Sequence, residues 1–186
     1  FARDNQLIVH MDGARLMNAV VESGVSAKDY ATQVDTVWID LSKGLGCPIG
    51  SVLAGSEVFI QEAWQWKQRM GGSMRQSGII AAAGIFAFKH NVQRLKEDHE
   101  NARALANSLS DLPGINIDPG RVETNIILFQ VTSDQMSAHD LAARLAKFGI
   151  RIGAMTDREI RLVTHLDVSR EDVLEAAEAI KEAVNP

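Results

Sequence analysis

The sequence is poor in cysteine, proline and tyrosine, and the shortage of cysteine excludes two kinds of structural site. It holds one cysteine, four prolines and one tyrosine in 186 residues. A single cysteine excludes a disulfide framework and a thiolate zinc site, and it suits a reducing cytoplasm. There is no apolar run near the roughly 20 residues that span a bilayer, and no signal peptide is visible. We therefore expect a cytoplasmic protein that neither crosses nor binds a membrane.

Charge and composition narrow the class further. The chain has 19 basic and 24 acidic residues, and no block of Lys or Arg stands out, so nucleic acid is not an expected partner. Hydrophobic residues make up 46% and charged residues 23%, which is globular usage. A mass of 20.3 kDa corresponds to one ordinary domain or two small ones.

The N-terminus has an unusual pattern. The chain opens at Phe1 without Met and reaches a core-strand pattern within ten residues. We interpret this as a processed or truncated chain.

The first part of the chain has the pattern of a strand–helix–strand unit. An apolar run at 7–11 predicts a strand buried on both faces, helical spacing follows at 14–23, and 34–41 predicts a second strand. Asp12 and Lys43 are 31 positions apart, and such a unit takes roughly 30 residues. Both residues should therefore lie just past the ends of two parallel strands, at the sheet edge where α/β proteins bind ligands.

The middle of the chain predicts one more strand and two helices. The loop at 42–50 is too short for a parallel crossover, so the strand at 51–55 should be antiparallel. A helix at 56–70 follows, capped by Ser56, and then one long helix at 77–109. Its first half, 79–88, is apolar all round and should be buried, whereas its charged second half should face solvent.

The last part of the chain predicts a smaller α+β lobe. After the breaker cluster at 112–114 we expect a strand at 124–131, a helix at 138–148 and a strand at 159–163. A final helix begins at Ser169, where Asp172 completes a pattern like a capping box.

Lys43 is the first candidate for chemistry. It lies between a strand end and a glycine-rich turn, where partial burial would favour a neutral amine that attacks a carbonyl. The alternative is an exposed lysine in a flexible hairpin. The glycines could also form a phosphate cradle, although no Walker pattern is present.

Asp12 is the second candidate, because an acidic residue that closes an all-apolar strand is hard to explain by packing. A Schiff-base lysine with an aspartate facing the pyridinium nitrogen is the protein's part in pyridoxal-phosphate chemistry. The alternative is that Asp12 caps the next helix, with Arg15 as its salt-bridge partner.

Other reactive residue types give weaker signals. His90, His99, His139 and His165 show no metal-ligand spacing, and we predict no metal site. His10 is interpreted as a satisfied core histidine. Of Trp64 and Trp66, two residues apart on one helix, at most one should be core and the other could contact another subunit. Cys47 is interpreted as a small packed residue rather than a reactive thiol.

Four blocks, taken in order, carry a resemblance to a known family. They are HMDGAR at 10–15, LSKGLGCPIG at 41–50, GGSMRQ at 71–76 and IRLVTH at 160–165. Together they resemble the threonine aldolase family, and within it the low-specificity L-threonine and phenylserine aldolases.

The resemblance implies an α/β fold, that of pyridoxal-phosphate (PLP)-dependent transferases of the aspartate-aminotransferase type (fold type I). Residues 1–76 would be the C-terminal part of the PLP-binding large domain, 77–109 a linking helix, and 110–186 the small C-terminal α+β domain. The implied activity is cleavage of L-threonine or other β-hydroxy-α-amino acids to glycine and an aldehyde, in a homo-oligomer (dimer or tetramer) with shared sites.

The resemblance also implies roles for five residues. Lys43 would form the Schiff base with PLP, and Asp12 would pair with the pyridinium nitrogen. Arg15 and Arg161 would hold the substrate carboxylate, Arg15 also lining the cofactor site. Arg75 would reach the cofactor phosphate of a neighbouring subunit.

The sequence departs from the family pattern in three places. Ser73 stands where glycine is common, and Cys47 where a smaller residue such as alanine is common. A phosphate-binding Gly/Thr turn and a ring-stacking histidine are not found upstream of Asp12. A β-eliminating lyase, an aminotransferase of the same fold and an inactive truncated fragment therefore remain as alternatives.

Overall fold

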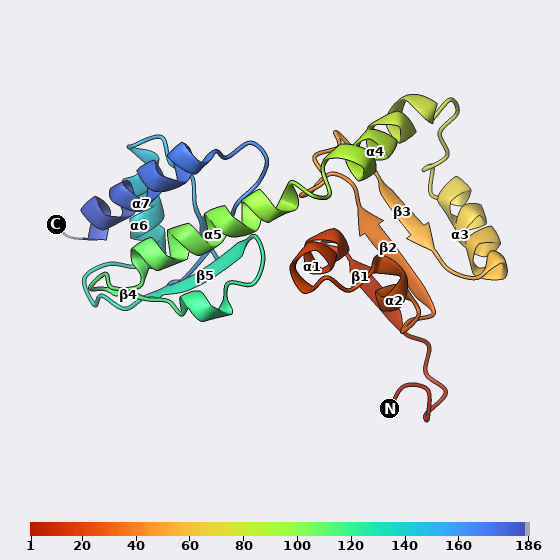
Figure 1. Cartoon of the computed structure of the whole chain (residues 1–186), viewed down its shortest axis with the longest axis horizontal. Coiled ribbons are helices and arrows are strands. Elements are labelled where there is room, and N and C mark those ends of the chain that lie inside the picture. The colour runs from red at the N-terminus through yellow and green to blue at the C-terminus, as the bar shows by residue number, and fades with distance from the viewer. Residues whose placement is uncertain (185–186) are drawn as a thin grey trace. The chain divides into compact units, whose positions relative to one another are not determined.

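The computed structural model describes residues 1–184 and divides the chain into two compact units (Figure 1). Unit 1 comprises Phe1–Leu95 and unit 2 comprises Lys96–Pro186. Within residues 1–184, no helix combines the length and apolar character needed to cross a membrane.

Unit 1 is built on a three-stranded sheet in the order β1-β2-β3. Strand β1 (His10–Gly13) runs parallel to β2 (Thr36–Asp40), and β3 (Ser51–Ala54) runs antiparallel to β2. The crossover from β1 to β2 contains α1 (Leu16–Ser23). The parallel pair and the antiparallel third strand are both confirmed.

A second crossover helix, α2 (Ala27–Ala31), was not expected. Its signal is Ser26, whose hydroxyl oxygen accepts from the Asp29 N–H. Five residues are too few to produce a periodic apolar pattern.

The prediction of a doubly buried strand at 7–11 is wrong. The strand begins at His10, and the Leu7 and Ile8 side chains are 54% and 83% exposed. The preceding segment instead folds into turns, in which the Leu7 N–H donates to the Ala2 carbonyl. Within the described residues β1 pairs on one side only, with β2.

The helix after β3 agrees with its prediction. α3 spans Glu57–Arg69, and the Ser56 hydroxyl accepts from the Phe59 N–H as a helix cap. Trp64 and Trp66 of α3 are both exposed, so neither is core.

The single helix predicted for 77–109 is wrong, because the structure has α4 (Gly78–His90) and α5 (Leu95–Leu109). The break falls at Asn91, which ends α4 and donates from its side-chain Nδ2 to the Leu45 carbonyl at 2.7 Å. This bond ties the end of α4 to the loop after β2.

The burial expected for the two halves is also wrong. On α4, Gly84 and Ala87 are buried, whereas Ile79 is 86% exposed. On α5, Ala102, Leu105, Ala106 and Leu109 share one face and are buried in the core of unit 2. Charged residues dominate the α5 sequence, but its apolar residues recur on one face of the helix. Burial follows this spacing and not the mean composition of the helix.

Unit 2 is a four-stranded antiparallel sheet in the order β4-β5-β7-β6, packed against helices. The strands are β4 (Ile115–Asn116), β5 (Ile126–Val131), β6 (Gly153–Ala154) and β7 (Glu159–Val163). Side chains of α5, α6 (Ala138–Ala146) and α7 (Arg170–Val184) complete one continuous core with β5 and β7.

The longer elements of unit 2 agree with prediction, and its two-residue strands β4 and β6 were missed. A short 3-10 helix at Pro119–Arg121 was missed as well. The capping box at α7 is confirmed, since the Ser169 N–H donates to the Asp172 carboxylate and the Asp172 N–H to the Ser169 hydroxyl.

Candidate active site

Asp12 and Lys43 lie at the carboxyl ends of two neighbouring parallel strands. Asp12 is the third of four residues in β1 and is opposite Trp38 of β2, and Lys43 is the third residue after β2 ends. The prediction that one sheet edge carries both residues is therefore confirmed, with Asp12 inside its strand rather than just past it. In an open α/β sheet this edge is the place for a ligand.

The Asp12 carboxylate has one oxygen engaged locally. Its Oδ1 accepts from the Ala14 N–H at 3.0 Å, in the turn that leads into α1. Its Oδ2 makes no hydrogen bond to any residue in 1–184, so Asp12 can stabilise this turn and still offer an oxygen to a bound group.

Gly13 allows β1 to come close to β2. A Cβ at this position would lie 2.3 Å from the Trp38 carbonyl oxygen, so a side chain would push the strands apart. The glycine thus fixes the height of Asp12 relative to the end of β2.

The Lys43 side chain contacts two residues of β2. Its Nζ lies 3.1 Å from Asp40 Oδ2 and 5.2 Å from the centroid of the Trp38 ring. The amine therefore has both a carboxylate and an aromatic face beside it.

Asp40 was not singled out in the sequence, although it closes an apolar strand just as Asp12 does. Its Oδ1 accepts from both the Ser42 N–H and the Ser42 hydroxyl, each at 2.7 Å. Burial acts to raise the pKa of Asp40, but these hydrogen bonds and the Lys43 ammonium outweigh it, so the pKa lies below its ordinary value.

The loop that carries Lys43 is anchored at several points. The Cys47 N–H donates to the Leu41 carbonyl, and the Leu41 N–H to the Gly50 carbonyl. A Cβ on Gly44 would lie 2.9 Å from a Leu95 methyl, so this glycine is required for close packing. These contacts define the conformation of the loop and thereby the position of the Lys43 backbone.

Cys47 is a packed residue, as expected. Its side chain is buried with Leu41, Leu45, Ala87 and Leu95. Burial raises the pKa of the Cys47 thiol, which disfavours the reactive thiolate.

Two further predicted residues belong to unit 1. Arg15 is the partly buried residue that precedes α1, directly after the Asp12 turn. Arg75 lies in the exposed connection between α3 and α4, and it makes no hydrogen bond or ion pair with any residue in 1–184. Arg15 thus lies near the Asp12 turn in the sequence, whereas Arg75 extends from a separate loop.

Arg161 belongs to unit 2 and is described there by itself. It is the central residue of β7, between the buried Ile160 and Leu162, and it pairs with Leu128 of β5. Since alternate residues of a strand face opposite ways, Arg161 lies on the sheet face away from the core, together with the exposed Leu128.

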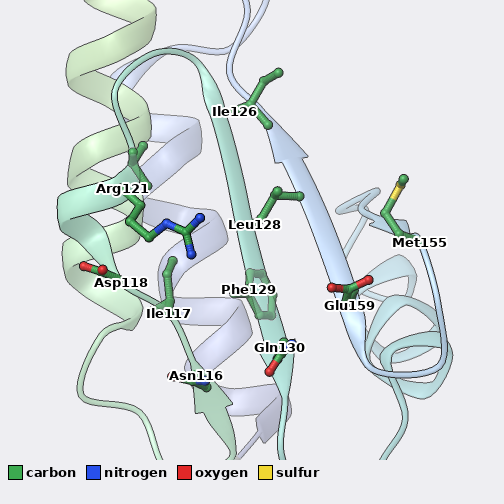
Figure 2. Close-up of a pocket in the computed structure, with 11 residues that line it drawn as sticks. Asn116, Ile117, Asp118, Arg121, Ile126, Leu128, Phe129, Gln130, Met155 and Glu159 are labelled. Atoms are coloured by element: carbon green, nitrogen blue, oxygen red, sulfur yellow. The ribbon is translucent and has the colours of Figure 1, made fainter.

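That outer face of unit 2 carries a cavity of about 550 Å³ that the sequence did not indicate (Figure 2). Its lining includes Asp118, Arg121, Leu128, Gln130, Met155 and Glu159. Figure 2 shows the Arg121 side chain directed toward β5, with Glu159 and Met155 across that strand. No predicted site residue lines this cavity.

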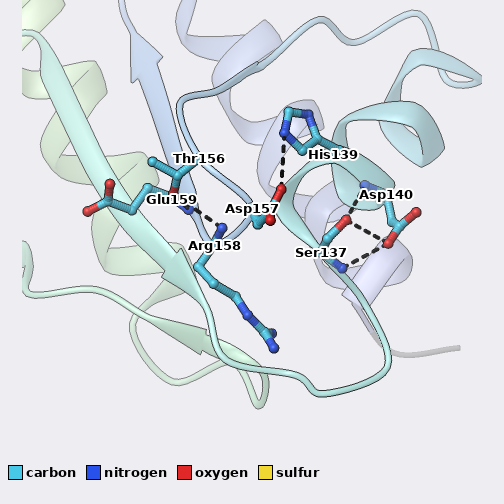
Figure 3. A network of polar contacts seen from close by, with 7 residues as sticks. All are labelled: Ser137, His139, Asp140, Thr156, Asp157, Arg158 and Glu159. Carbon is cyan, nitrogen blue, oxygen red and sulfur yellow. Dashed lines mark hydrogen bonds and ion pairs between the residues drawn. The ribbon is translucent and has the colours of Figure 1, made fainter.

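A polar network at the start of α6 stabilises the fold (Figure 3). Ser137 and Asp140 form a capping box, and His139 Nε2 lies 3.6 Å from an Asp157 carboxylate oxygen. Both partners of the His139–Asp157 pair are largely exposed, so this contact contributes little.

Solved structures with the same arrangement define the class of fold. A protein of Listeria monocytogenes EGD-E, described as a candidate L-allo-threonine aldolase, superposes with a TM-score of 0.78 at 24% identity, over 98% of this chain and 53% of that one. Alanine–glyoxylate aminotransferase of a Nostoc species gives 0.66 at 16% identity, over 99% and 55%. The fold is fold type I, that of PLP-dependent aminotransferases and threonine aldolases.

Sequence comparison then gives the family. The family model described as beta-eliminating lyase matches residues 1–134, and the chain belongs to this family. It is 44% identical over 177 residues to the low specificity L-threonine aldolase of Escherichia coli K12, covering 95% of this chain and 51% of that protein. A probable low-specificity L-threonine aldolase 2 of Arabidopsis thaliana is 38% identical, covering 92% and 49%.

These relatives confirm the resemblance to threonine aldolases. The chain spans about half the length of the curated relatives it matches.

Proposed function

We propose that this chain forms part of a PLP-dependent aldolase that cleaves L-threonine or related β-hydroxy-α-amino acids to glycine and an aldehyde. The observation that carries the proposal is the placement of Lys43 and Asp12 at the ends of adjacent parallel strands. The names of the relatives, low-specificity L-threonine aldolases, support the substrate class.

The residues at this sheet edge fit PLP. An amine that can bond to an aldehyde lies on an anchored loop, and a carboxylate with a free oxygen lies on the next strand. When bound, PLP supplies an electron sink for the bond that breaks at the substrate Cα. Asp12 would keep a proton on the pyridine nitrogen, because a carboxylate favours a cation at hydrogen-bond distance.

The arginines would bind the substrate and the phosphate. We assign Arg15 and Arg161 to the substrate carboxylate, since a guanidinium binds a carboxylate through two parallel hydrogen bonds. Arg161 suits this role because, within residues 1–184, its guanidinium is not engaged in a hydrogen bond or ion pair. Arg75 would bind the PLP phosphate of a neighbouring subunit.

Assembly into a homodimer or homotetramer is part of the proposal. Unit 1 exposes large apolar side chains on and around α3 and α4: Trp64, Trp66, Met70, Met74, Ile79 and Phe86. Exposed aromatic residues and methionines of this kind are typical of protein interfaces. Arg75 lies between the same two helices, so one interface could both bury this surface and deliver the arginine.

Domain roles and location complete the proposal. We assign unit 1, which contains 1–76, to the cofactor-binding large domain and unit 2, which contains 110–186, to the small domain. Of the intervening segment 77–109, α4 packs in unit 1 and α5 contributes to the core of unit 2. We also propose a cytoplasmic location, which the single free cysteine supports.

β-Elimination is the second candidate activity, and the description of the matching family favours it. Product analysis separates the two. The purified chain, given PLP and L-threonine, should release equal amounts of glycine and acetaldehyde. Release of ammonia and a 2-oxo acid instead would support elimination and contradict the aldolase.

A further inference from the structure

The two oxygens of the Asp40 carboxylate have different partners. Oδ1 accepts both hydrogen bonds from Ser42, and Oδ2 lies 3.1 Å from Lys43 Nζ. The same carboxylate therefore shapes the turn after β2 and fixes the amine that this turn carries.

The Asp40–Lys43 pair differs from an ordinary surface ion pair in its burial. The Asp40 side chain is only 13% exposed and that of Lys43 is 36% exposed. Water screens such a pair less than a fully exposed one, so the carboxylate should have a measurable effect on the amine.

The Trp38 ring adds a second constraint on the same amine. Its centroid lies 5.2 Å from Lys43 Nζ, within the range where an ammonium is attracted to an aromatic face. The carboxylate and the ring therefore both hold the amine near the end of β2.

We propose that Asp40 is the positioning residue of Lys43: its carboxylate holds the amine at the end of β2 whenever the amine is not joined to the cofactor. The inference rests on the proposed function. Asp40 then limits how freely the amine can reach an electrophile, and it provides the place to which the lysine returns.

Other charged groups lie on the elements around Lys43, and they are the same in wild type and in every variant tested. Asp12 and Arg15 stand at the end of β1 and the start of α1, with Glu22 farther along α1, and Lys89 and His90 end α4. The effect of Asp40 is therefore measured as the difference in Lys43 reactivity between wild type and a variant at position 40.

Asp40→Asn separates the two functions of the carboxylate. An amide oxygen can still accept both hydrogen bonds from Ser42, but the amide NH₂ that replaces Oδ2 cannot pair with an ammonium. The turn at Ser42 should therefore keep its hydrogen bonds, whereas the ion pair with Lys43 is lost.

The experiment is trace acetylation of the purified chain with acetic anhydride, read out by peptide mass spectrometry. Lys28 is the internal reference, because it is exposed on α2 and makes no ion pair with any residue in 1–184. Under one fixed set of conditions, Asp40→Asn should label Lys43 about 3- to 10-fold faster relative to Lys28 than wild type does, because the amine is no longer held by the carboxylate.

Controls keep the outcome specific. Glu62→Gln on α3 removes one negative charge elsewhere in unit 1 and should leave the Lys43 ratio unchanged. A wild-type measurement in 1 M salt needs no variant, and it should raise the ratio because salt of this strength screens the pair. An unchanged ratio in both Asp40→Asn and 1 M salt would overturn the inference, as would an increase of the same size in Glu62→Gln.

The inference and the proposed function fail in different ways. If reduction with borohydride places PLP on another lysine, the proposed function fails whatever Asp40 does. If PLP is found on Lys43 but Asp40→Asn leaves the labelling ratio unchanged, the function stands and the positioning role is wrong.

Discussion

Asn125 and Thr164 bond to each other just beyond the paired ends of β5 and β7. The Thr164 N–H donates to the Asn125 carbonyl at 3.0 Å, and Asn125 Nδ2 donates to the Thr164 carbonyl at 2.9 Å. Both side chains are buried, and the Thr164 hydroxyl also donates to the Asp98 carbonyl on α5. The strand that carries Arg161 is thereby fastened at its carboxyl end to its neighbour and to a helix.

Asn125→Ala should lower the free energy of unfolding by about 1–3 kcal/mol, because a buried carbonyl loses its donor. Urea denaturation checks this prediction. The matched control is Asn116→Ala on the exposed face of β4, which should change stability by less than about 0.5 kcal/mol. Equal effects of the two substitutions would contradict a special role for Asn125.

Asp12→Asn should keep the fold and reduce turnover roughly 10- to 100-fold. The side chain keeps its size, but it can no longer stabilise a proton on the pyridine nitrogen, and a hydrogen bond to a charged group is worth about 1.5–3 kcal/mol. Steady-state rates with saturating PLP check the prediction. Asp35→Asn is the control, since Asp35 accepts from the Val9 N–H beside the same strand pair and has no proposed catalytic role. Wild-type turnover in Asp12→Asn would refute the assignment.

Arg75→Ala should weaken PLP retention without unfolding the chain. Dialysis followed by absorbance of the remaining cofactor measures the loss. If the arginine acts across subunits, a mixture of Arg75→Ala and Lys43→Ala should recover part of the activity that each lacks, because some sites receive both native residues. An active monomer would contradict this prediction, as would a mixture with no recovery.

Acid should destabilise unit 2 partly through its helix caps. Hydrogen bonds from the Ser137 hydroxyl and N–H lower the pKa of Asp140, and Ser169 lowers the pKa of Asp172 in the same way. A folded-state pKa below the unfolded value gives stability that is present above the unfolded pKa, about 3.9 for Asp, and is lost as pH falls through the folded pKa. Replacing both aspartates by Asn should therefore flatten the decline in Tm between about pH 4 and pH 2. An unchanged slope would show that other groups cause the decline.

Much of the fold could be predicted because burial follows sequence periodicity. β5 alternates cleanly between the buried Ile127, Phe129 and Val131 and the more exposed residues between them, and the caps at Ser56 and Ser169 mark helix starts. The predictions that were wrong concern features that depend on contacts between residues far apart in the sequence. The helix breaks at Asn91, whose side chain donates to the Leu45 carbonyl, 46 positions earlier. Strands β4 and β6 have two residues each and carry no pattern of their own.

In the candidate site, too, some residues could be predicted from spacing and others could not. Asp12 and Lys43 were placed correctly, because the length of a strand–helix–strand unit determines which residues share a sheet edge. Asp40 was missed although it also ends an apolar strand. Its importance depends on the turn at Ser42, which folds Lys43 back toward the strand, and no spacing rule predicts that turn.

The most direct test of the account is to identify the lysine that binds PLP. The purified chain is incubated with PLP, reduced with borohydride, digested and mapped by mass spectrometry. The account predicts the pyridoxyl adduct on Lys43 and its loss in Lys43→Ala, with the other lysines serving as controls in the same digest. An adduct on Lys28 or Lys67 that is unaffected by Lys43→Ala would contradict the central claim.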